Sequence, residues 1–155
     1  MLRFLFAAFL VSKALSAAAS DACAMVPQAQ IGAMLGTTKN NGITNLKQLP
    51  PAANATEGKA CSYVGKDNSA TVFWYKFGTP AAAREYLKTK RDEFEKQKVK
   101  TTPEKFGSED GFSFSSGMLA VKKNVCFRVN VYSTVGKVVA LDLTRQLMLD
   151  TLHAN

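Results

Sequence analysis

The sequence is poor in the residues that most enzyme active sites use. Its one histidine, His153, lies near the C-terminus, where chains usually fray. Its three cysteines are too far apart for a paired-cysteine zinc motif. The acidic pair Glu109–Asp110 is too small for a calcium loop, and neither a glycine-rich phosphate loop nor a nucleic-acid-binding motif is present. We therefore expect no enzyme, no metal, no cofactor and no nucleic-acid partner.

The sequence also lacks an apolar run of about 20 residues, the length that crosses a bilayer. A short apolar run, 4–11, follows the basic Arg3, and small residues continue to Ser20. This order of basic, apolar and small residues is typical of a secretory signal peptide. We predict a signal peptide over 1–20, cleaved after Ala19 or Ser20, and export to the periplasm or the extracellular space. The alternative is a retained N-terminal anchor.

The remaining residues, 21–155, have the length of one ordinary domain with a single core. Loss of 1–20 removes two basic residues and no acid, which lowers the formal net charge from +8 to +6. The positive charge is spread along the chain and is densest over 88–100, where acids are interleaved. This distribution favours a soluble basic surface. Association of helix 80–98 with anionic lipid or a polyanion is the alternative.

Export places Cys23, Cys61 and Cys126 in an oxidising compartment, which predicts one disulfide and one free thiol. We favour a Cys23–Cys61 bond, which would tie the start of the mature chain to the first main strand. In the second arrangement Cys23 carries lipid and Cys61 pairs with Cys126. Ser20 and Asp21 argue against a lipidation signal.

The periodicity of apolar residues predicts an α+β domain. We expect an antiparallel sheet of about five to six strands, two longer helices and one short N-terminal helix. Thr79 and Pro80 suit the N-cap and first turn of the clearest helix. The predicted helices are 26–36, 80–97 and 138–152, and the predicted strands are 60–64, 70–77, 112–115, 118–122 and 125–132, with a short edge strand over 43–49.

Strand 125–132 has the strongest period-two pattern and follows a hairpin turn at Lys123–Asn124. Its valine-rich face (Val125, Phe127, Val129, Val131) is expected to form the floor of the core beneath helix 80–97. Its polar face (Cys126, Arg128, Asn130, Tyr132) carries a thiol, a guanidinium, an amide and a phenol. We predict that this polar face is the most pocket-like, ligand-facing surface of the protein.

Several short motifs resemble a group of small exported bacterial cysteine-containing proteins of unknown function, many of which are lipoproteins. The similar segments are Cys23-Ala24-Met25-Val26 before 31–36, Cys61-Ser62-Tyr63, the glycine–acid turn 106–112, and 119–124. The resemblance implies a PsbP-like α+β architecture, a Cys23–Cys61 disulfide and no catalytic residues. The lipidation signal of those relatives is missing here, and Cys126 is not part of the pattern.

Together these observations predict an exported, soluble envelope protein that acts as a non-enzymatic binding or interaction module. The expected partner is an envelope protein or a small ligand, and membrane association is not favoured.

Overall fold

The computed structural model describes residues 22–26, 28–36, 39–115 and 117–155. The expected signal peptide over 1–20 and its cleavage sites lie outside the described residues. Among the described helices, none is long and apolar enough to cross a membrane.

All seven strands belong to one antiparallel sheet, in the order β1-β2-β3-β7-β6-β5-β4. The α+β class is as predicted, but five to six strands is too few. The strands are β1 (Lys39–Ile43), β2 (Ala55–Val64), β3 (Asn68–Phe77), β4 (Thr102–Phe106), β5 (Glu109–Phe114), β6 (Gly117–Lys122) and β7 (Val125–Ser133).

β1 and β4 form the two edges of the sheet. The sequence predicts an edge strand at the wrong residues for β1 and no strand for β4. β4 contains Pro103, whose missing N–H is tolerated at an edge because no further strand has to pair with it. β1 precedes the expected edge strand over 43–49, where the structure instead has a single 3-10 turn, Leu46–Gln48. Edge strands are short and only half covered, so their sequences have little periodicity to detect.

In the described part of the chain the sheet is accompanied by the helices α2 (Gln28–Leu35), α3 (Pro80–Lys96) and α4 (Lys137–Ala154). α3 begins as predicted, because the Thr79 side chain accepts a hydrogen bond from the Ala82 amide at 3.1 Å. It ends in an unusual way: Lys98 adopts a left-handed φ of 59°. The amides of Lys98 and Val99 donate back to the carbonyls of Glu95 and Phe94, which is the Schellman pattern that usually has glycine at this position.

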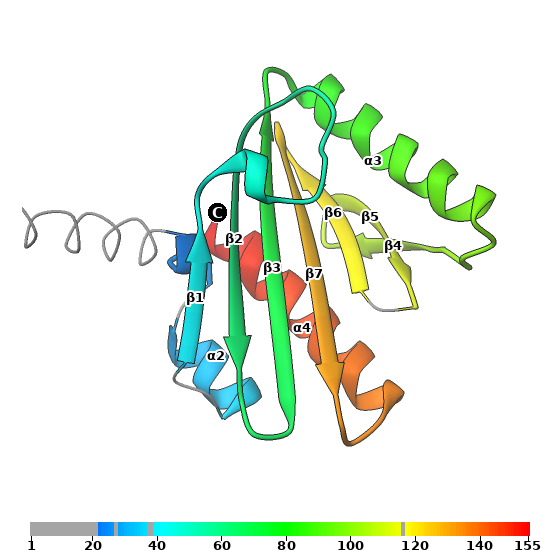
Figure 1. The fold of residues 1–155 in the computed structure, drawn as a ribbon. Coiled ribbons are helices and arrows are strands. Elements are labelled where there is room, and N and C mark those ends of the chain that lie inside the picture. The colour runs from blue at the N-terminus through cyan, green and yellow to red at the C-terminus, as the bar shows by residue number, and fades with distance from the viewer. Residues whose placement is uncertain (1–21, 27, 37–38, 116) are drawn as a thin grey trace, which may run out of the picture.

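β7 separates two cores, one on each face of the sheet. Phe127 and Val129 pack with Leu147 of α4, which runs behind the sheet in Figure 1. On the opposite face, Cys126 packs with Tyr86 of α3. The prediction that the valine-rich face lies beneath helix 80–97 is therefore wrong: α4 covers that face. Alternation along a strand separates two faces, but it does not say which helix covers each one.

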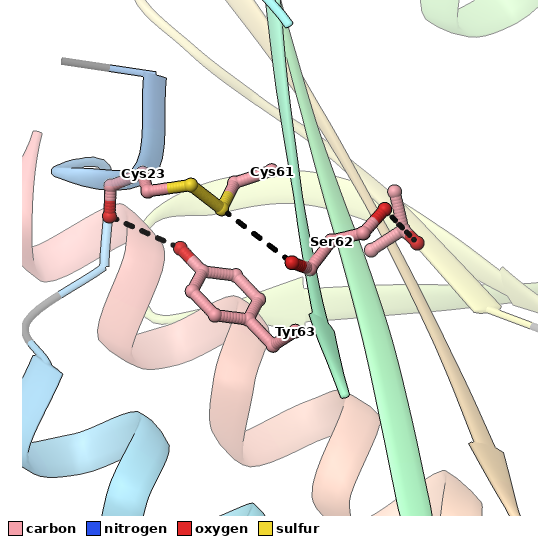
Figure 2. Close-up of a disulfide and its surroundings, with 5 residues drawn as sticks. Cys23, Cys61, Ser62 and Tyr63 are labelled. Carbon is pink, nitrogen blue, oxygen red and sulfur yellow. Dashed lines mark hydrogen bonds between the residues drawn. A yellow bond between two sulfur atoms is a disulfide. The ribbon is translucent and has the colours of Figure 1, made fainter. Parts of the chain in front are cut away.

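A disulfide between Cys23 and Cys61 ties the start of the described chain to β2 (Figure 2). Both cysteines are buried, and the Tyr63 hydroxyl beside them donates to the backbone oxygen of Cys23 at 3.1 Å. The favoured pairing is thus the one found, and Cys126 is the free, buried thiol. The alternative pairing of Cys61 with Cys126 is excluded by this bond.

Candidate functional site

The polar face of β7 divides into a buried part and an accessible part. Cys126 is 0% exposed because α3 lies over its end of the strand. This burial raises the pKa of the Cys126 thiol to about 12, an effect that the nearby Arg128 charge partly opposes. A neutral, fully covered thiol cannot contact a ligand, so the prediction that Cys126 is ligand-facing is wrong.

Arg128 and Asn130 lie together on the same face, and both are half-buried. The Arg128 guanidinium lies 5.8 Å from the ring centre of Phe73 and 5.3 Å from that of Phe114. Its Nε donates to the Asn130 side-chain oxygen at 2.9 Å. Two aromatic rings and one amide therefore orient this cation, and Asn130 accepts from one of its five N–H groups.

Tyr132, the last of the predicted residues, is 70% exposed and lies at the edge of an open cleft. The cleft has a volume of about 770 Å³, within the range of small-molecule sites. It forms where β7 extends beyond its last pairing with β6, at Asn130 opposite Gly117. Its walls come from the segment after α3, the end of β5, the end of β7 and the first turns of α4.

The cleft lining is apolar at its floor and cationic at its rim. Its buried apolar side chains are Phe114 and Val131, each 6% exposed. The cationic residues are Lys98, Lys100 and Lys137, all exposed, and no aspartate or glutamate is among the lining residues. The remaining lining residues are Val99, Thr102, Ser113, Ser115, Gly117, Tyr132, Ser133, Ala140, Leu141 and Thr144.

Exposed apolar side chains gather beside the cleft, at the corner between β7 and α4. Of the five large apolar side chains that are exposed in the described part of the chain, four belong to this corner. They are Tyr132, Val135, Val139 and Leu141, and only Val64 lies elsewhere. All four come from one stretch of the chain, 132–141, and Tyr132 and Leu141 are the two that line the cleft.

A second, smaller depression of about 360 Å³ lies between α3 and strands β4 and β5. Arg84, Lys88 and Arg91 line it on one side, but Glu104 and Asp110 line it on the other. Glu104 already accepts a hydrogen bond from Arg145 at 2.7 Å, and Asp110 pairs with Lys105. Because both carboxylates are already paired, Arg84 and Lys88 take part in none of the ion pairs among the described residues.

Metal-ligating side chains are scattered in the part of the chain that the structure describes. Within those residues, no three side chains among His, Cys, Asp and Glu gather to hold a metal ion. His153 is exposed in the last turn of α4.

Tyr132 lines the cleft, and the lysines that line it with Tyr132 are not predicted from the sequence. Lys98, Lys100 and Lys137 come from two segments that are far apart in the sequence, so no local motif joins them. One signal was available: the apolar residues of 138–152 surround more than one face of the helix, which indicates contact on two sides. α4 covers the sheet with one face and leaves Val139 and Leu141 exposed.

No protein-family model matches the sequence, and no curated protein matches it. Among solved structures, the fold is similar to that of the extracellular domain of PknH from Mycobacterium tuberculosis. The TM-score is 0.60 at 13% identity, and the match covers 89% of this chain and 97% of that one. A weaker match, with a TM-score of 0.42 at 14% identity, is a GTP-binding regulator from Thermotoga maritima, covering 76% of this chain and 75% of that one. At these identities the similarity concerns the fold alone.

Proposed function

We propose that this protein is exported and that residues 21–155 form a non-enzymatic module that binds a small ligand in the cleft beside Tyr132. The cleft itself carries the proposal. It combines an apolar floor, hydroxyl groups and a cationic rim in about 770 Å³, next to the main group of exposed apolar side chains. A concave, largely apolar surface with a few polar groups is the usual form of a ligand site.

Two observations support export. The sequence begins with the features of a signal peptide, and the Cys23–Cys61 disulfide suits an oxidising compartment. The test is the mass of the protein after expression from its full coding sequence and fractionation of the cells. We expect a chain that begins at Ser20 or Asp21, in the periplasm or medium. A full-length chain that stays with the cytoplasm would contradict export.

The binding role is tested with a matched pair of α4 substitutions. Leu141 is 42% exposed and lines the cleft, whereas Val139 is 38% exposed and does not. We expect the wild-type protein to bind the fluorescent probe anilinonaphthalene sulfonate with a blue-shifted emission. Leu141→Glu places a carboxylate at the apolar wall and should weaken this binding by about tenfold or more. Val139→Glu should bind like the wild type, and equal effects of the two substitutions would refute a ligand site in the cleft.

The second candidate function is association of helix 80–98 with anionic lipid or a polyanion. Arg84, Lys88 and Arg91 follow one side of α3, which is the observation in its favour. Arg91 faces Glu95 at 3.8 Å and Lys90 pairs with Glu93 at 2.7 Å, so acidic residues lie among the cations of the same helix. This mixture of signs makes α3 a weaker anion-binding surface than the cleft rim.

A further inference from the structure

The charges around the cleft indicate which chemical class of ligand it would hold. We infer that the cleft binds a monomeric anionic amphiphile with one hydrocarbon chain, with the acidic headgroup at Lys98, Lys100 and Lys137 and the chain along Tyr132 and Leu141. This inference rests on the proposed binding role and goes further by naming the ligand class.

The first step of the argument is the uncompensated positive charge of the rim. None of the ion pairs within the described residues involves these three lysines. Glu95, an acidic residue close in sequence to Lys98, faces Arg91 at 3.8 Å and accepts a hydrogen bond from Thr101. No carboxylate is among the lining residues, so the three cations favour an anion in the cleft.

The second step is the apolar lining, which separates an amphiphile from a small inorganic anion. Tyr132 is 70% exposed and Leu141 is 42% exposed, and both line the cleft together with the lysines. A phosphate or sulfate ion alone would leave this apolar surface in contact with water. A hydrocarbon chain covers it, and each buried methylene group strengthens binding by up to about fourfold.

The third step is the backbone at Lys98. Its left-handed φ of 59° is the conformation that glycine adopts most readily, and this is the position of the helix-ending motif where glycine is usual. A lysine here is strained relative to glycine, although its positive charge suits a helix C-terminus. The position aims a cation at the rim of the cleft.

The experiment uses two single-chain lipids that differ in headgroup charge, myristoyl lysophosphatidic acid and myristoyl lysophosphatidylcholine. Both are titrated into the mature protein by calorimetry at concentrations where they remain monomeric. We expect the anionic lipid to bind at least about tenfold more tightly, because three cations favour its phosphate. Added salt should reduce the difference in affinity between the two lipids, and a shorter acyl chain should weaken the binding of both lipids.

The key variant is Lys98→Gly. It removes a rim cation and at the same time relieves the backbone strain, so the protein should keep or gain stability while its affinity for the anionic lipid falls about fivefold. Lys137→Ala should have a similar effect on affinity. Lys88→Ala, an exposed lysine of α3 outside the cleft, is the control and should leave affinity unchanged.

The possible failures are distinguishable. If both lipids bind equally, or if the lysine variants do not change the ratio between them, the ligand class is wrong but the binding role stands. If neither lipid binds and Leu141→Glu behaves like Val139→Glu, the binding role fails as well. If the protein binds phosphatidylglycerol vesicles but not the monomeric anionic lipid, the corner is a membrane-docking surface and the inference is overturned. An effect of Lys88→Ala alone would favour helix 80–98.

Discussion

Removal of the Cys23–Cys61 disulfide tests how the start of the domain is held. The bond joins residues 38 positions apart in the sequence. On the chain-entropy estimate, closing a loop of this length stabilises the folded state by about 4 kcal/mol. The double variant Cys23→Ala, Cys61→Ala should therefore lose about that much free energy of unfolding. It retains a single thiol, the buried Cys126, so disulfide exchange cannot complicate the measurement.

The assay is urea denaturation of the wild-type and double-variant proteins, followed by circular dichroism. Besides the loss of stability, we expect a steeper dependence on urea for the variant, because its unfolded chain is no longer cross-linked and exposes more surface. A loss below about 1 kcal/mol with an unchanged slope would refute the reasoning. It would mean that contacts other than the disulfide hold the segment around Cys23 against β2.

Substitution of Tyr63 tests whether the disulfide holds the segment around Cys23 against β2. Tyr63→Phe removes the hydrogen bond to the backbone oxygen of Cys23, 3.1 Å long and buried, and should cost about 1–2 kcal/mol in the wild-type background. In the disulfide-free background the segment is free to leave Tyr63, so the same change should cost less. Equal costs in both backgrounds would show that the segment stays in place without its covalent bond.

Two further outcomes follow from the described contacts. Burial raises the pKa of Cys126 from its ordinary value of 9.0 to about 12, so the unfolded chain releases this proton first, and stability is lost as pH rises from about 9 towards 12. Between about pH 9 and 10, the free energy of unfolding measured in urea should decline for the wild-type protein but not for Cys126→Ala. Above about pH 10 it should decline for both proteins, because burial also raises the pKa of Tyr63 and of Tyr75 to about 12. Thr79→Ala should lower the free energy of unfolding by about 1 kcal/mol through loss of the helix cap, whereas Thr79→Ser should retain most of it.

The parts of the fold that the sequence predicts are those with local signals. Thr79 and Pro80 mark the start of α3, and the alternation of 125–132 identifies β7 together with its hairpin partner. The Cys23–Cys61 pairing was favoured on similarly simple grounds, as a tie between the mature N-terminus and a strand. The start of α3 and the β7 hairpin depend on neighbouring residues, and the disulfide depends on a choice among only three cysteines.

The parts that it does not predict depend on contacts between distant segments. Cys126 and Tyr132 share one face of β7, yet the first is covered by α3 and the second is exposed at the cleft. Nothing in the alternation of the strand distinguishes them, because the difference comes from where α3 crosses the sheet. The cleft is non-local in the same way, since its lysines follow α3 and begin α4.

The most direct test of the binding site is a map of the residues that respond to a ligand. Myristoyl lysophosphatidic acid is titrated into the isotopically labelled mature protein, and backbone amide shifts are followed by NMR. The account predicts the largest changes over 98–102, 113–115, 131–133 and 137–144, the segments that line the cleft. Changes confined to the outer face of α3, or an absence of saturable changes at the cleft, would contradict it.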